Sequence, residues 1–181
     1  MKQITFVLLL FIVISCSSDD VNNYYFTDSE RALLIYNIGD SFSLLREPQM
    51  DTLAFAFTEI IRDSSRTSAL GLFYHNSESY DATFNHSTSI FGGIYAFKEP
   101  YFMMTIALKV ENFKTEFEGS LYDTLYNHTL NNKEYPELYV FAKEKGKSPM
   151  LYYTKEEGIV YIDSTASGNS YALIEYIKGG E

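Results

Sequence analysis

The sequence predicts an all-β domain, either an antiparallel β-sandwich or a partly open β-barrel, with room for one short helix. From about residue 30 onward, apolar residues recur with the two-residue period of strands, and the strand-like runs are short and separated by turn-forming residues. Long segments with the 3.6-residue period of helices are missing between these runs. The length of 181 residues, with 46% hydrophobic and 17% aromatic residues, is that of one globular domain.

Charge and cysteine content exclude several kinds of function. The 14 basic and 24 acidic residues give a formal net charge of −10. The molecule as a whole therefore repels phosphate backbones, and we predict no nucleic-acid partner. Cys16 is the single cysteine of the chain. An intramolecular disulfide and a cysteine-based zinc site are ruled out for that reason.

The first sixteen residues have the features of a secretory signal. Lys2 supplies a positive charge, and the apolar run 4–14 is too short to cross a bilayer core of about 30 Å as a permanent helix. The run ends in Val-Ile-Ser-Cys at residues 13–16, which resembles the lipobox of bacterial lipoproteins. The resemblance implies cleavage before Cys16 and attachment of two or three fatty chains to it, a firmer anchor than one acyl chain. An ordinary signal peptide with an incidental cysteine is the alternative.

This resemblance divides the chain into a signal peptide (1–15), a lipidated cysteine with a flexible tether (16–27) and a single β-rich domain (28–181). Ser17 stands where enteric lipoproteins retained in the inner membrane carry aspartate, which implies sorting to the outer membrane. The stretch 17–20 resembles the acidic export signal of surface lipoproteins of Bacteroidetes. We therefore expect an outer-membrane, lipid-anchored protein that faces the periplasm or the cell surface.

The strands of the first two thirds are predicted from local patterns. Residues 32–38 and 41–45 flank a Gly-Asp turn signal, which predicts a hairpin. The runs 53–61 and 102–110 alternate strongly and are predicted to be central strands. Residues 116–127 place several apolar side chains near helical spacing, so a short helix is the alternative to a strand there, and Gly119 disfavours it.

Four short β-rich runs near the C-terminus predict an antiparallel meander; they are residues 138–142, 150–154, 158–162 and 171–177. Residues 130–175, together with the lipobox and the opening hairpin, resemble small uncharacterised outer-membrane lipoproteins of the Bacteroidetes type. In those proteins a turn and a tyrosine introduce a strand, a tyrosine-rich strand turns into Gly-Ile-Val, and one more strand closes the sheet. The resemblance brings no known activity with it.

The sequence lacks recognisable catalytic, cofactor and metal motifs. His75, His86 and His128 have no second His or Cys within four residues, and the phosphate-cradling, dinucleotide-binding and serine-hydrolase motifs are missing. We therefore predict no enzyme, no cofactor and no metal site. The alternative is that His75 and His86 face each other across a hairpin and form a metal or catalytic pair.

Tyrosine and phenylalanine are abundant, with 16 Tyr and 14 Phe but no Trp. Five tyrosines of the meander form either an exposed platform for a glycan or a peptide, or the packed rim of a sheet; they are Tyr135, Tyr139, Tyr152, Tyr153 and Tyr161. Thr124 and Ser164 follow aspartates in a pattern that resembles the O-glycosylation site of exported Bacteroidetes proteins. We predict both as possible modification sites.

Three functions are compatible with the sequence. The first is a non-enzymatic outer-membrane lipoprotein that acts as a binding or accessory module of an envelope protein complex, or that binds a glycan. The second is a carrier of lipid or another hydrophobic ligand, in which the runs 53–61 and 102–110 line a half-open barrel. The third is a hydrolase of surface glycans or peptides, which would need His75 or His86 beside a carboxylate in a cleft.

Overall fold

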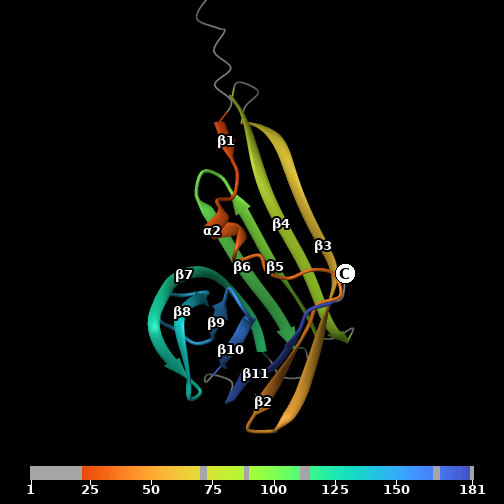
Figure 1. Ribbon diagram of the computed structural model, residues 1–181, viewed down its shortest axis with the longest axis vertical. Helices are drawn as coiled ribbons and strands as arrows, with labels where there is room; N and C mark the ends of the chain where they lie inside the picture. The colour runs from red at the N-terminus through yellow and green to blue at the C-terminus, as the bar shows by residue number, and fades with distance from the viewer. Residues whose placement is uncertain (1–21, 70–72, 88–89, 111–114, 165–167, 180–181) are drawn as a thin grey trace, which may run out of the picture.

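The computed structural model describes residues 22–69, 73–87, 90–110, 115–164 and 168–179. Ten antiparallel strands run up and down in chain order, and the last pairs with the first, which closes the sheet into a barrel (Figure 1). The all-β prediction is confirmed, in the form of a closed barrel. The barrel strands are β2 (Ser41–Glu47), β3 (Asp51–Ala69), β4 (Phe73–Ser87), β5 (Ile90–Lys98), β6 (Phe102–Val110), β7 (Thr115–Leu130), β8 (Lys133–Ala142), β9 (Met150–Thr154), β10 (Gly158–Ser164) and β11 (Asn169–Ile177).

Aromatic side chains fill the interior of the barrel. Inward and outward residues alternate along each strand, so that Phe42 and Leu44 of β2 are buried between half-buried neighbours. Phe42 stacks on Phe55 of β3 with ring centres 4.8 Å apart, and Phe84 of β4 meets both rings edge-on. The space between these strands is therefore a packed core.

The strongest alternating patterns form strands where they are predicted. The predicted strand 102–110 is β6, and the run 53–61 lies within the longer β3. The four C-terminal runs are parts of β8 to β11, each paired with the next as a meander. Two-residue alternation identified β6 and the predicted part of β3, because each has one face in the core and the other toward solvent.

The short helix, the alternative to a strand within residues 116–127, is wrong. These residues belong to β7, which pairs with β6 from Thr115 to Ser120 and with β8 from Ser120 to Leu130. Phe117 is buried while its neighbour Glu118 is exposed, which is the two-residue period of a strand. Hydrogen-bond pairing on two sides outweighs the weak helical spacing of a few apolar residues.

The predicted hairpin at residues 32–38 and 41–45 is wrong in its first half. Residues 25–40 form an irregular segment, here called the cap, which contains the four-residue helix α2 (Asp28–Arg31). Leu33, Leu34 and Tyr36 of the cap are buried in the same core as the barrel strands, so their apolar pattern reflects burial of a loop. The second half of the prediction is β2.

β3 and β4 continue past the barrel as a two-stranded ribbon (Figure 1). β2 pairs with β3 only up to Ala56, whereas β4 stays paired with it up to Ala69. The short strand β1 (Asn22–Tyr24) pairs in parallel with β4 on this ribbon, and Phe26 is buried against Phe102. Residues 22–27, predicted to be the end of the flexible tether, therefore belong to the folded unit, because they find a strand edge and an apolar contact there.

Candidate functional site

Buried tyrosines fasten the cap to the barrel. The Tyr80 hydroxyl donates a hydrogen bond to the Tyr36 carbonyl oxygen (3.1 Å), and the Tyr153 hydroxyl donates to the Leu33 carbonyl oxygen (2.6 Å). In the other direction, the Ile159 backbone N–H donates to the Tyr36 hydroxyl (2.8 Å). Burial raises the pKa of all three tyrosines, so their hydroxyls stay protonated and keep these bonds. Backbone carbonyl groups of the irregular cap, which have no partner strand, thus accept hydrogen bonds from side chains of the barrel.

Asp40, which is 1% exposed, holds the end of the cap. Its Oδ2 accepts hydrogen bonds from the Tyr176 hydroxyl and from the Asn37 backbone N–H, both at 2.8 Å. Its Oδ1 accepts from the Gly179 backbone N–H at 2.7 Å. One carboxylate thus joins the cap to β11 and to the residues that follow β11, which makes the cap a rigid wall for any site beside it.

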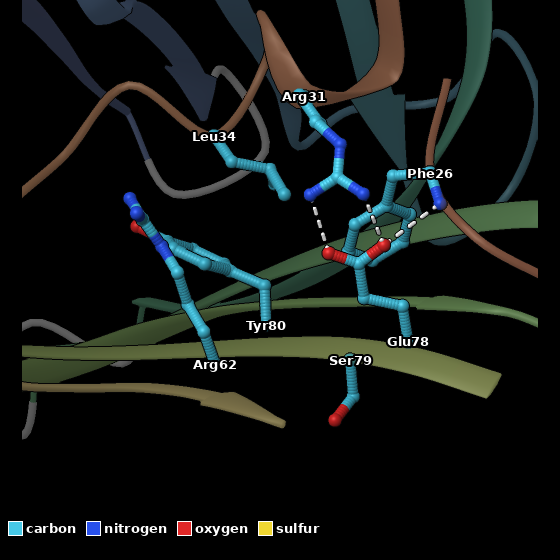
Figure 2. A pocket seen from close by; sticks show the side chains of 7 residues that line it. All are labelled: Phe26, Arg31, Leu34, Arg62, Glu78, Ser79 and Tyr80. Carbon is cyan, nitrogen blue, oxygen red and sulfur yellow. Dashed lines mark hydrogen bonds and ion pairs between the residues drawn. The ribbon is translucent and has the colours of Figure 1, made fainter. Parts of the chain in front are cut away.

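A pocket of about 110 Å³ lies between the cap and the β3–β4 ribbon, and we call it the rim pocket (Figure 2). The cap supplies two apolar side chains and one guanidinium, and the ribbon supplies the other groups. The pocket is lined by Phe26, Arg31, Leu34, Arg62, Glu78, Ser79 and Tyr80. Residues far apart in sequence therefore meet around a small concave site.

One side of the rim pocket is an ion pair. The Arg31 guanidinium donates two parallel hydrogen bonds to the Glu78 carboxylate, at 2.5 and 2.6 Å. The backbone N–H of Phe26 donates a third to Glu78 at 3.0 Å. This arrangement neutralises Glu78 and fixes α2 against β4.

The other side of the rim pocket is the exposed guanidinium of Arg62, which lies 5.6 Å from the centre of the Tyr80 ring (Figure 2). Arg62 forms no ion pair with a carboxylate of the described residues. The pocket therefore carries a local net charge of +1 in a chain of formal net charge −10. A cation placed over an aromatic face, beside apolar side chains, suits a small organic anion.

A second surface feature is a group of exposed side chains on β5, β6 and the turn between them. We call it the aromatic face; its members are 38–78% exposed and are Phe91, Tyr95, Phe97, Tyr101 and Met103. Phe97 and Met103 are direct cross-strand partners. A hollow of about 320 Å³ lies beside Phe91 and Tyr95 on this wall. Exposed apolar side chains grouped on neighbouring strands in this way typically mark a contact site.

The predicted site residues lie apart from these features. Cys16 and the predicted signal peptide fall outside the described residues. Thr124 is half-buried in β7, and Ser164, at the end of β10, is 3% exposed. Burial leaves the Ser164 hydroxyl little accessible to a modifying enzyme, whereas Thr124 is more accessible. O-glycosylation of both residues stays a prediction.

The meander tyrosines form no exposed platform among the described residues, so that interpretation is wrong. Tyr139 and Tyr153 are buried, and the other three are half-buried. Tyr152 and Tyr161 pack together with ring centres 6.0 Å apart. Burial raises the pKa of Tyr139 to about 12, and Lys155 lies 5.2 Å from its ring centre. These contacts are those of sheet-rim packing, the other interpretation.

The alternative interpretation, in which His75 and His86 face each other across a hairpin, is wrong. Both residues lie in β4, one continuous strand, so no turn brings them together. At about 3.3 Å per residue their backbones are roughly 36 Å apart. Nδ1 of the exposed His86 ring is 2.7 Å from the Ala54 carbonyl oxygen.

Within the described residues, no group of three or more His, Cys, Asp or Glu side chains is placed to hold a metal ion. The helix α2 has four residues, and the described part of the chain contains no helix able to span a membrane. No family model, curated protein or solved structure matches this chain.

Proposed function

We propose that this chain is a lipid-anchored protein of the bacterial outer membrane, and that its barrel is a non-enzymatic binding module for a small organic anion held in the rim pocket. The observation that carries the binding proposal is Arg62, which lies over Tyr80 in a concave site without an ion-pair partner among the described residues. The anchor at Cys16 and the outer-membrane location are supported by the lipobox resemblance of residues 13–16.

A carboxylate is the anion that suits the pocket best. A guanidinium presents parallel N–H donors that match the two oxygens of a carboxylate. Leu34 and Phe26 offer apolar surface on the cap side, where a short hydrocarbon chain could pack. The small volume of about 110 Å³ suits a short-chain acid.

The charged groups of the pocket favour binding over catalysis. Glu78 already accepts three hydrogen bonds from Arg31 and from the Phe26 backbone, so three of its roughly four lone-pair positions are engaged. Guanidinium groups stay protonated throughout the physiological range, so Arg31 and Arg62 do not exchange protons with a substrate. Positioned charge without a titrating acid or base serves recognition.

Butyrate is the probe that tests this site. We expect it to bind in the millimolar range and to shift the backbone amide NMR signals of Ser79 and Tyr80. Arg62→Gln should weaken binding by about tenfold or more, because a charge-assisted hydrogen bond is worth about 1.5–3 kcal/mol. Butyramide, which has the same shape without the charge, should bind more weakly.

Lys145→Gln is the matched control, because it removes one exposed positive charge on the β8–β9 connection, far along the chain from the pocket. It should leave butyrate binding unchanged. If Arg62→Gln and Lys145→Gln weaken butyrate equally, the effect is that of net charge, and the rim pocket is not the site.

The anchor is tested separately by growth of the native host with labelled palmitate. We expect label on the wild-type protein and none on Cys16→Ala. An unlabelled wild-type protein would overturn the membrane part of the proposal and leave the butyrate result standing.

A carrier of hydrophobic ligands is the second candidate, favoured by the closed barrel, an architecture that encloses small ligands in other proteins. Rings such as Phe42 and Phe55 occupy the described interior, so a ligand would have to displace them. A fluorescent fatty acid separates the two functions. If Arg62→Gln abolishes binding of the fatty acid, the fatty acid binds in the rim pocket. If Arg62→Gln leaves binding unchanged and Phe42→Trp abolishes it, the fatty acid binds in the barrel interior.

A further inference from the structure

The aromatic face lies on one side of the barrel. Phe91, Tyr95 and Phe97 occupy alternate positions of β5 and therefore point to the same side of the sheet. Met103 is the cross-strand partner of Phe97, and Tyr101 in the turn between β5 and β6 is the most exposed member at 78%. The five side chains thus run along β5 and past its end.

A glycine at position 93 lets the Tyr95 ring lie against the wall of the barrel. A Cβ at Gly93 would lie 2.6 Å from the Tyr95 hydroxyl oxygen and 2.7 Å from Cζ of that ring. The Tyr95 ring therefore lies down along the strand over Gly93. Any larger residue at position 93 would push the ring away from the wall.

The charged side chains around the aromatic face have mixed signs: Glu99 is exposed in the same turn as Tyr101, and Glu118 lines the hollow beside Phe91 and Tyr95. Lys109 lies 5.7 Å from the Phe91 ring centre, and Asp81 is the cross-strand partner of Tyr95 on the β4 side. Asp81 is half-buried. Attraction to this face would therefore come mainly from apolar contact and would depend little on salt.

The end of this face lies close to where the chain leads toward Cys16. Phe102, which follows the exposed Tyr101, packs on Phe26 with ring centres 5.6 Å apart, and Lys98 is ion-paired with Glu30. β1 begins at Asn22, only six residues after Cys16. Six residues span at most roughly 20 Å. Phe26, which packs on Phe102 beside the β5–β6 turn, is ten residues after Cys16, so a lipid on Cys16 keeps this turn within roughly 35 Å of the bilayer.

We infer that the aromatic face is a membrane-contact surface, which lies on the bilayer that holds the anchor; this inference rests on the proposed function. Phenyl and phenol rings and a thioether partition to the interface between head groups and acyl chains, with the tyrosine hydroxyl toward water. Contact along β5 would fix one orientation of the barrel on the membrane. The cap and the rim pocket would then face along the membrane surface.

A single introduced tryptophan tests this contact, because the natural chain has none. Phe97→Trp places the reporter in the aromatic face. Ile174→Trp places it at a position that is 54% exposed on β11, four strands away around the barrel. The full chain of each variant is attached to phosphatidylcholine vesicles with brominated acyl chains, both as the lipidated protein and, in parallel, through a maleimide lipid coupled to Cys16.

We expect Trp emission in Phe97→Trp to be blue-shifted and quenched at least about threefold more than in Ile174→Trp. Equal, weak quenching of both variants on vesicles would overturn the inference. A blue shift in Phe97→Trp that depends on protein concentration and not on brominated lipid would also overturn it, and would assign the face to a second copy of the chain. The coupled protein gives this answer even if native Cys16 carries no lipid, so failure of the anchor and failure of the membrane contact are distinguished.

Discussion

Aspartate and tyrosine side chains are buried both at the cap end and in the barrel wall, but their hydrogen bonding differs between the two regions. At the cap end, Asp40 accepts three hydrogen bonds and the Tyr153 hydroxyl donates to a cap carbonyl. On the barrel wall, Oδ1 of Asp81 and the hydroxyl of Tyr171 are buried without a hydrogen-bond partner among the described residues. The same chemistry therefore stabilises one region and costs free energy in the other.

The reason for this difference lies in the backbone. Strand residues satisfy their N–H and C=O groups in the sheet ladder, so a polar side chain on the wall finds few backbone partners. The irregular cap has unpaired backbone groups that side chains must satisfy. Tyrosine suits this task because its ring packs in the core while its hydroxyl reaches the cap.

The largest effect is expected for Asp40→Asn. An amide can replace only one of the two carboxylate oxygens as an acceptor, so at least one of the donors Tyr176, Asn37 and Gly179 is left opposite an NH₂ group. We expect a loss of about 2–4 kcal/mol in the free energy of unfolding, measured by urea denaturation. A loss below about 1 kcal/mol would mean that the cap contributes little to the stability of the barrel.

The sequence predicted the wall much better than the cap. The run 102–110 has a strict two-residue period because one of its faces lies in the core, and β6 has the predicted bounds. Residues 32–38 also carry an apolar pattern, but Leu33 and Tyr36 are buried by packing and by hydrogen bonds from Tyr153 and Ile159, which lie more than a hundred positions away. A local pattern shows that such residues are buried and leaves their backbone conformation open.

The rim pocket could not be predicted from the sequence either, because it also depends on contacts between residues far apart in the chain. Arg31 and Glu78 are 47 positions apart, and nothing local indicates that α2 packs on β4. Arg62 and Tyr80 are neighbours because β3 and β4 stay paired beyond the end of β2. The aromatic face left a visible signal, since alternate positions of residues 91–97 are aromatic or glycine. Alternation alone does not separate an exposed aromatic row from the packed rings of the tyrosine-rich meander, because both follow the two-residue period of a strand.

The second largest difference in stability is expected between variants of two fully buried tyrosines, Tyr153 and Tyr171. Tyr153→Phe removes the donor to the Leu33 carbonyl and should cost about 1–2 kcal/mol, because that oxygen is then buried without a partner. Tyr171→Phe removes a hydroxyl that has no partner among the described residues, and should be neutral or stabilising by up to about 1 kcal/mol. Urea denaturation of both variants checks the pair. Equal costs would remove the distinction between cap and wall.

The smallest effect is expected for Asp81→Asn, and its pH dependence identifies the cause. Burial, and then the nearby Glu59, raise the pKa of Asp81 above its usual value of 3.8. The folded protein therefore holds this proton more tightly than the unfolded chain, and wild-type stability falls as pH rises from 3.8 through the raised pKa. Asparagine has no charge to bury, so Asp81→Asn should be more stable than wild type by up to about 1 kcal/mol at about pH 7, and this gain should vanish at about pH 3.5. Urea denaturation at both pH values measures this gain in the free energy of unfolding. A gain of the same size at both pH values would point to better packing of the amide, and would mean that the buried charge of Asp81 does not destabilise the wall.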